Sequence, residues 1–247
     1  MLQGLRSTLF LVGQLGTAIL FTPFAIIAYP LSPVSRSRFI ANWARFVIWW
    51  LRVTCGLTHR VTGLENLPQR PSVILSKHQS AWETIAFQLI FPAQAWVLKR
   101  ELLWIPFFGW GLAATQPIAI DRRYGMRALE TVISAGVQRL REGRWVVVFP
   151  EGTRLSPGKR RRYNVGGATL AAKAGVPVVP VAHNSGTFWP RRGLVKRPGV
   201  IDVVIGHPIE PDGRGPKQVN AEAEAWIEET MVGLECTSAA AARARRG

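Results

Sequence analysis

The segment SVILSKHQSAWET, residues 72–84, joins a short apolar run to a helix-start pattern, with a histidine between them. Residues 71–76 are typical of a strand, and residues 80–91 indicate a helix. A strand that leads into a helix is the repeating unit of parallel α/β sheets. Ligands bind such sheets at the carboxyl ends of the strands, which is where His78 stands. The segment therefore predicts a fold class and the edge of the sheet that carries a functional site.

The same alternation continues along the rest of the chain. Further strands are predicted over residues 95–99, 144–150, 177–183 and 200–206, and further helices over residues 127–143 and 166–175. Apolar strands that alternate with helices form layers around a mainly parallel sheet. We therefore expect an α/β domain with a mostly parallel sheet flanked by helices.

The N-terminal part has a different character. Residues 7–35 carry no charged side chain, and the core of this run exceeds the roughly 20 residues that a membrane helix needs. In the next segment Arg38, Arg45 and Arg52 recur every seven residues among aromatic side chains, which favours an interfacial helix. The alternative is a helix that packs on the domain by its aromatic face. We expect residues 1–57 to form a membrane-associated helical hairpin that dips into or crosses one bilayer.

The remaining residues divide into one domain and a tail. Residues 58–235 are long enough for a single core, and residues 236–247, rich in alanine and arginine, are expected to form a disordered basic tail. The two cysteines, Cys55 and Cys236, indicate unpaired thiols, because their number and spacing match neither a disulfide framework nor a zinc site. No metal is therefore expected.

The chain is strongly basic, with 31 Lys and Arg residues against 15 Asp and Glu. This balance predicts an anionic partner: nucleic acid, an anionic bilayer or a phosphorylated substrate. A nucleic-acid-binding protein would also show aromatic-rich basic faces or a recognised binding motif, and the sequence has neither. We therefore expect no nucleic-acid partner.

His78 and Glu83 are candidates for a catalytic pair. Residues five apart lie on different faces of a regular helix, so the two side chains meet only if His78 lies in the loop and Glu83 in the first helical turn. Ser80 is a good N-cap, and with it Glu83 would complete a capping box. Glu83 therefore has two readings, a helix cap or a carboxylate that orients the histidine.

A second cluster follows the predicted strand in RWVVVFPEGTRLS, residues 144–156. Arg154 can grip a phosphate with two hydrogen bonds, Glu151 and Thr153 can bind hydroxyls, and Gly152 lets the backbone approach closely. The alternative is a surface turn with a Glu–Arg ion pair.

Four blocks, in order, resemble the 1-acyl-sn-glycerol-3-phosphate (lysophosphatidate) acyltransferase family of bacterial phospholipid synthesis. They are HQSAWE (78–83), PIAIDR (117–122), FPEGTR (149–154) and VPVVPV (176–181). Lys99 and Arg122 also stand at that family's phosphate-binding spacing. The resemblance implies a glycerolipid acyltransferase fold for residues 58–235 and an enzyme that makes phosphatidic acid.

The resemblance also implies roles for these residues. His78 would act as general base and Glu83 would orient it, while Lys99 and Arg122 bind the acceptor phosphate. The other binding residues would be Glu151, Gly152, Thr153 and Arg154. It implies no cofactor: acyl-coenzyme A or acyl carrier protein would be a co-substrate, and the enzyme would work with membrane lysophospholipid at the bacterial inner membrane, its catalytic domain facing the cytoplasm. Oxyanion donors are expected among backbone N–H groups at the start of the Ser80 helix.

Two departures from the family pattern keep alternatives open. Glu83 stands where the family usually has aspartate, and Asn164 stands where relatives often carry lysine. Another lysolipid, such as lyso-ornithine lipid or a lysophospholipid, is an alternative acceptor. A non-catalytic lipid-binding protein is the alternative if glutamate is incompatible with the chemistry.

Overall fold

The structure is a computed structural model that describes residues 1–121, 123 and 125–244. The described residues form a seven-stranded sheet in the order β1-β7-β6-β2-β5-β3-β4. The strands are β1 (Leu57–Thr62), β2 (Val73–Ser76), β3 (Gln94–Lys99), β4 (Ile118–Ile120), β5 (Trp145–Val148), β6 (Val178–His183) and β7 (Gly199–Ile205).

Neighbouring strands pair in parallel except at one place. β6 and β7 are antiparallel, and β1 pairs with β7 in parallel, so β1 and β7 run opposite to the other five strands. The expected mostly parallel α/β sheet is confirmed. The strands at β1 and β4 were not predicted as strands.

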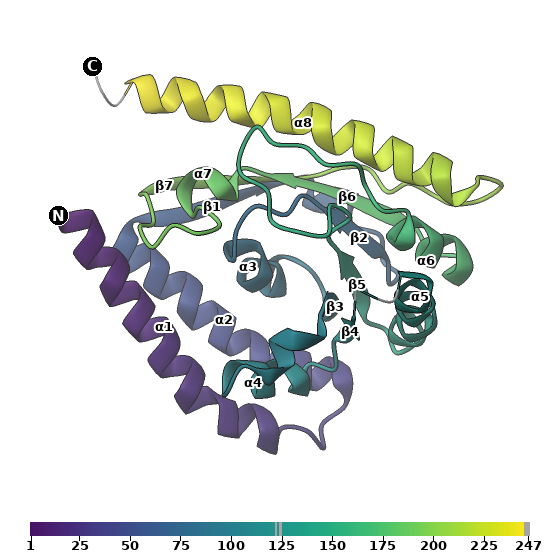
Figure 1. Ribbon diagram of the computed structural model, residues 1–247, viewed down its shortest axis with the longest axis horizontal. Helices are drawn as coiled ribbons and strands as arrows, with labels where there is room; N and C mark the ends of the chain where they lie inside the picture. Colours follow the sequence, from purple (N-terminus) through teal and green to yellow (C-terminus); the bar gives the residue numbers. More distant parts are fainter. Residues whose placement is uncertain (122, 124, 245–247) are drawn as a thin grey trace.

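Side chains of alternate residues separate the core into two layers. Ile74, Val147 and Val179 point to the face covered by α2 and α3. Val73 and Val146 point to the opposite face, covered by α5, α6 and α8 (Figure 1). The helices of the domain are α3 (Trp82–Ile90), α4 (Phe108–Ala114), α5 (Gly125–Arg141), α6 (Gly166–Ala174), α7 (Ser185–Phe188) and α8 (Pro216–Ala244), with short 3-10 turns η1 (Leu64–Asn66) and η2 (Arg100–Trp104).

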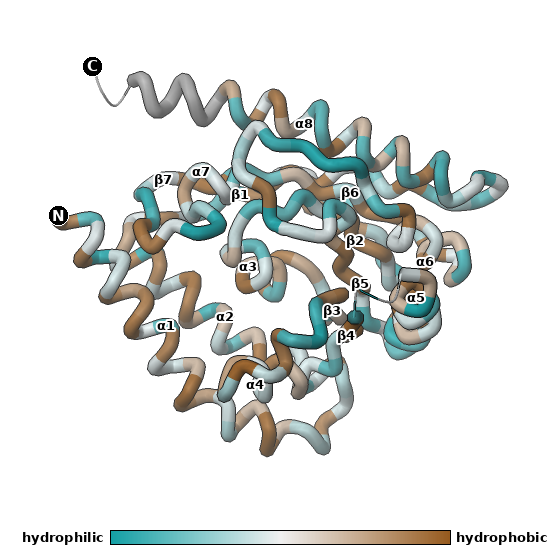
Figure 2. The backbone as a smooth tube through the Cα atoms, in the orientation of Figure 1, coloured by the Kyte–Doolittle hydropathy of each residue, from teal (hydrophilic) through white to brown (hydrophobic). Residues whose placement is uncertain are grey.

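The N-terminal hairpin consists of α1 (Leu2–Ile27) and α2 (Pro33–Cys55), which lie side by side in Figure 1. Within the described residues, α1 alone is long and apolar enough to cross a membrane. Figure 2 shows its apolar character, and many of its large apolar side chains are exposed. α2 packs Ala44, Val47 and Leu51 against the core while Arg38 and Arg45 remain exposed. α2 therefore packs on the domain by one face, as in the alternative given from the sequence, and exposes a stripe of arginines on its other face.

The C-terminal segment from residue 236, expected to be a disordered basic tail, begins within α8. α8 continues to Ala244, and residues 245–247 lie outside the described part of the chain. The alanine run in residues 239–242 favours a helix, because alanine has the highest helix propensity of all residues.

Candidate active site

Three neighbouring strands carry the predicted residues to one edge of the sheet. β6, β2 and β5 are adjacent and parallel, so their carboxyl ends lie together. His78 comes shortly after β2, Glu151 shortly after β5, and His183 ends β6. A cavity of about 440 Å³ opens beside His78 and extends between α1, α2, α3 and α4. This edge and cavity form the candidate active site.

His78 and Glu83 are in hydrogen-bond contact. His78 Nδ1 lies 2.9 Å from Glu83 Oε1. The same oxygen accepts the backbone N–H groups of Gln79 and Ser80, each at 2.8 Å, and Oε2 accepts the Ser185 hydroxyl at 3.0 Å. Glu83 lies in the first turn of α3, whereas His78 is still in the loop. One buried carboxylate therefore caps the helix start and contacts the histidine, so the two readings of Glu83 are compatible.

The helix start differs in detail from the predicted capping box. The N-cap position is Ala81, and Ser80 Oγ accepts from the Trp82 N–H at 3.1 Å. The Ser80 N–H, one of the backbone groups at this helix start, is bonded to Glu83. The oxyanion donors at the start of this helix stay a prediction.

Electrostatics keep Glu83 ionised despite its burial. Burial raises the pKa of this carboxyl group, but the neighbouring His183, the hydrogen bond and charge of His78 and the Ser80 N–H outweigh it, and the pKa is about 2. An ionised carboxylate can only accept hydrogen bonds, so His78 must carry its proton on Nδ1. In the neutral ring, Nε2 is then the atom with the free lone pair, which can accept a proton.

Phe149 fixes the plane of the histidine ring. The two rings stack with centroids 3.8 Å apart and an interplanar angle of 11°. Phe149 also stacks on Trp96, with centroids 5.9 Å apart. The sequence analysis did not assign a role to Phe149 or to Ser185. Phe149 opens the FPEGTR block, whereas Ser185 lies about a hundred residues from Glu83 and carries no local signal.

Glu151 does not line the cavity as the sequence predicted. It is fully buried, accepts from Lys77 Nζ at 2.6 Å, and accepts from the His78 backbone N–H at 3.2 Å. Glu151 therefore pairs with a lysine on the loop that carries His78. Within the described part of the chain, the Glu–Arg ion pair of the alternative interpretation is not formed either. Asn164 holds the same turn, since its backbone and side-chain N–H groups both donate to the Pro150 carbonyl at 2.9 Å.

Basic and hydroxyl groups of the predicted set do reach the cavity. Its lining includes Lys99 at the end of β3 and Thr153 and Arg154 after β5, while Arg191 Nη1 donates to the Arg154 carbonyl at 2.9 Å. Gly152 also lines it, with a φ of 72°, a conformation that favours glycine. Arg122 lies outside the described residues.

The rest of the lining is mostly apolar. It is formed by Phe21 and Ala25 of α1, Trp43 of α2, and Leu112 of α4, among others. The cavity therefore joins a polar end, beside His78 and the basic residues, to an apolar end beneath the N-terminal hairpin. Among the described residues, no group of three or more His, Cys, Asp or Glu side chains is arranged to hold a metal ion.

Comparison with known proteins shows which family the chain resembles. Residues 58–184 match the family model described as Acyltransferase. A 1-acyl-sn-glycerol-3-phosphate acyltransferase of Pseudomonas aeruginosa is 46% identical over 234 residues, covering 93% of this chain and 91% of the relative.

The chain belongs to the acyltransferase family. A human relative, 1-acyl-sn-glycerol-3-phosphate acyltransferase alpha, is 29% identical over 205 residues and covers 81% of this chain and 72% of its own. The crystal structure of a 1-acyl-sn-glycerophosphate (LPA) acyltransferase from Thermotoga maritima has a TM-score of 0.78 at 22% identity, covering 94% of this chain and 95% of its own. The resemblance stated from the four blocks is confirmed, and so is the expected fold.

The acyltransferase site has the parts of a general-base catalyst. The His78 ring is bonded to a carboxylate rather than to a serine or cysteine that would serve as nucleophile. A ring with Nδ1 bonded to an anion and Nε2 unprotonated can remove a proton from a hydroxyl group. Glu83 reaches the ring despite its extra methylene, since its carboxylate lies within hydrogen-bond distance of Nδ1.

Proposed function

We propose that this acyltransferase transfers a fatty acyl group from an acyl thioester to the sn-2 hydroxyl of 1-acyl-glycerol-3-phosphate and so forms phosphatidic acid. The observation that carries the proposal is the contact of His78 with an ionised Glu83 at the polar end of a largely apolar cavity. The names of the relatives that match most of the chain support this acceptor.

The proposed transfer is direct. His78 Nε2 takes the proton of the sn-2 hydroxyl as its oxygen attacks the thioester carbonyl, giving a tetrahedral intermediate. The intermediate collapses by breaking the carbon–sulfur bond, and the imidazolium returns its proton to the leaving thiolate. Glu83 stabilises the imidazolium between these two steps. No covalent acyl-enzyme is formed.

The basic residues of the cavity suit the acceptor's phosphate. Lys99 and Arg154 supply positive charge, and Thr153 supplies a hydroxyl, all in the lining that includes His78. Guanidinium groups bind phosphate with paired hydrogen bonds. Arg122 remains an expectation from the family resemblance.

Exposed arginines of two surface loops suit an anionic acyl donor. Arg160, Arg161 and Arg162 lie in the connection between β5 and α6, the hydrophilic loop beside α8 in Figure 2, and Arg191 and Arg192 lie in the loop after α7. Acyl-coenzyme A and acyl carrier protein are both anionic, so either donor is compatible with this surface. Kinetics with each donor would distinguish them.

A continuous apolar surface supports a location at the membrane. The outer side of α1 exposes Leu9, Val12 and Leu20, and the neighbouring η2–α4 region exposes Trp104 and Trp110, which are 70% and 48% accessible. Tryptophan concentrates at the boundary between headgroups and acyl chains. We place the enzyme on the cytoplasmic side of the bacterial inner membrane, where lysolipid and thioester meet and where anionic lipid attracts a basic protein.

Acyl transfer by the purified full-length protein tests the proposal. Labelled acyl-coenzyme A and acyl carrier protein are offered with lysophosphatidate, a lysophospholipid and lyso-ornithine lipid as separate acceptors. We expect labelled phosphatidic acid from the first acceptor, and a loss of about 10²- to 10⁴-fold in rate in His78→Ala. Transfer mainly to another lysolipid would overturn the proposed acceptor, and a near wild-type rate in a folded His78→Ala protein would overturn the mechanism.

A further inference from the structure

A buried chain of ion pairs connects α8 to the loop that carries His78. We propose that Glu228 on α8 is a positioning residue for acyl transfer, acting through Lys77 and Glu151 on the backbone of His78. The inference rests on the proposed function only in that its effect on turnover is measured as acyl transfer. α8 begins after the part of the chain that matches the family model, residues 58–184.

The contacts are continuous from helix to histidine. Lys77 Nζ donates to Glu228 Oε1 at 2.7 Å and to Glu151 Oε1 at 2.6 Å. The second oxygen of Glu151 accepts the His78 backbone N–H at 3.2 Å. The His78 carbonyl in turn accepts the Leu155 N–H at 2.8 Å, from the loop that follows Glu151. The backbone N–H and carbonyl of His78 are thus both bonded to the segment 151–155, and Lys77 is bonded to Glu151 in that segment.

Burial makes this network sensitive to the loss of any member. Lys77 is 2% exposed, Glu151 is fully buried, and Glu228 is 12% exposed. Arg160 Nε lies 3.1 Å from Glu228 Oε2, so two cations face two anions and the charges balance. A buried charge that loses its partner is strongly destabilised, whereas the intact set gives little net stability compared with apolar side chains.

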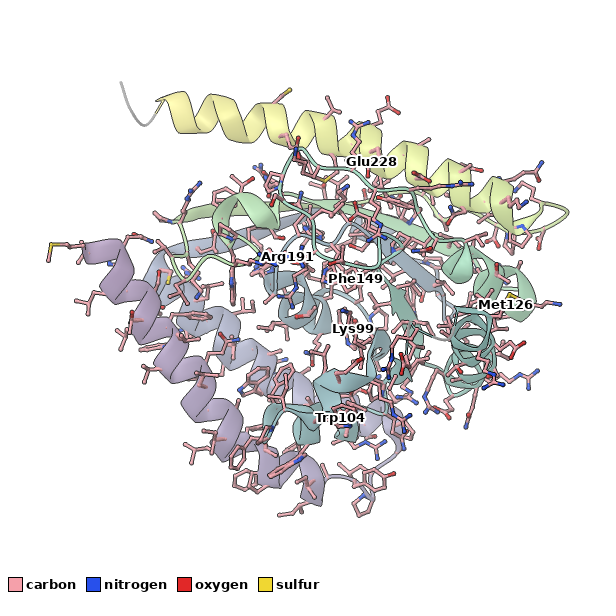
Figure 3. All side chains as sticks on the ribbon, viewed as in Figure 1. Lys99, Trp104, Met126, Phe149, Arg191 and Glu228 are labelled. Atoms are coloured by element: carbon pink, nitrogen blue, oxygen red, sulfur yellow. The ribbon has the colours of Figure 1, made fainter. Side chains whose placement is uncertain are left out.

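Glu228 contacts Lys77 from α8. Figure 3 labels Glu228 at α8, outside Phe149, which stacks on the catalytic ring. Glu228 Oε1 is itself fixed by the Tyr163 hydroxyl, which donates to it at 3.0 Å. Without Glu228, the ammonium of Lys77 keeps Glu151 and the Lys159 carbonyl, the latter at 3.4 Å, but loses its second carboxylate partner. Glu151 is then less firmly aimed at the His78 N–H, and the His78 ring is less firmly aligned.

The alternative is that the ion pairs only hold α8 on the domain. A merely structural role lowers the folded fraction or the melting temperature but leaves turnover per folded molecule unchanged. A positioning role lowers kcat in folded protein and leaves the KM values of acceptor and donor near wild type, because Glu228, Lys77 and Glu151 do not bind substrate in the proposal. The two roles are therefore separated by kcat, KM and thermal stability measured together.

The experiment compares Glu228→Gln, Lys77→Met, the double variant and Glu229→Gln in the full-length protein. Glu229 is the matched control, since it is the next residue on α8, carries the same charge and is exposed. We expect kcat to fall about tenfold in Glu228→Gln, the effect of one charged hydrogen bond, and to stay at wild type in Glu229→Gln. The double variant should be no slower than Lys77→Met, because Glu228 acts through Lys77.

A second readout keeps the test independent of the proposed reaction. The chain has four histidines, so ¹⁵N-histidine labelling gives four backbone amide signals, and His78→Ala identifies that of His78. Glu228→Gln should shift the His78 amide signal but not that of His207, which is exposed in the loop after β7. Absence of acyl transfer in the wild type, with the amide shift present, would overturn the proposed function and leave the connection intact. An unmoved His78 amide, or an unchanged kcat in Glu228→Gln, would overturn the inference.

Discussion

Glu83 reaches His78 across five positions of the chain because the two residues belong to different local structures. The histidine is in the loop after β2, the glutamate is in the first turn of α3, and Nδ1 and Oε1 are 2.9 Å apart. The same Oε1 also holds the two N–H groups at 79 and 80, so the position of the carboxylate is set by the loop backbone and the position of the ring is set by the carboxylate.

Two substitutions of Glu83 test separately its negative charge and the length of its side chain. Glu83→Gln can donate a hydrogen bond to Nδ1 and stabilises the wrong tautomer, so kcat should fall by about 10²- to 10⁴-fold. Glu83→Asp keeps the charge but withdraws it by one methylene, so an intermediate loss is expected. Acyl-transfer kinetics on folded protein measure both, and unchanged turnover in the two variants would leave Glu83 as a helix cap only.

The low pKa of Glu83 predicts a stability loss in acid. The folded-state pKa of about 2 lies below the ordinary 4.5, so the carboxylate is favoured by folding. This contribution is complete above about pH 4.5 and is lost as the pH falls toward 2, amounting to about 3 kcal/mol. The free energy of unfolding, measured in detergent by denaturant titration at several pH values, tests this prediction. In Glu83→Gln the free energy of unfolding should fall less between pH 4.5 and pH 2 than in the wild type. An equal fall in both proteins would contradict the low pKa of Glu83.

Phe149 offers a test of ring alignment that changes no charge. Phe149→Leu removes the stacked ring at 3.8 Å from His78 and keeps an apolar side chain. An aromatic contact of this kind is worth about 0.5 to 1.5 kcal/mol, so we expect kcat to fall about two- to tenfold. Phe149→Tyr is the control that retains the stack. A Leu variant as fast as the Tyr variant would show that the ring is aligned without Phe149.

The exposed tryptophans of the η2–α4 region predict the membrane contact. Trp104→Ala with Trp110→Ala removes two large exposed side chains beside α1 and should weaken binding to anionic phospholipid vesicles. Met126→Ala is the matched control, because Met126 is 74% exposed but lies on α5, away from α4 in Figure 3. Vesicle flotation measures the bound fraction. Equal loss in both variants would argue against a specific contact at Trp104 and Trp110.

The sequence by itself determined the elements and the local part of the site. The apolar runs around β2, β5 and β6 specify strands, and the step from strand to helix places His78 at a sheet edge, because these features depend on residues close together in the chain. The contact with Glu83 is equally local. The family resemblance then implied the roles of these residues in acyl transfer.

Tertiary structure alone decided the partners that come from distant segments. Lys77 and Glu228 are 151 positions apart, and Ser185 meets Glu83 across 102. Nothing near Glu151 in the sequence indicates that it turns inward to Lys77 rather than toward substrate. The directions of β1 and β7 and the covering of the cavity by α1 and α4 were decided in the same way. A buried charge takes the partner that the packed fold brings within reach, and local sequence does not record that partner.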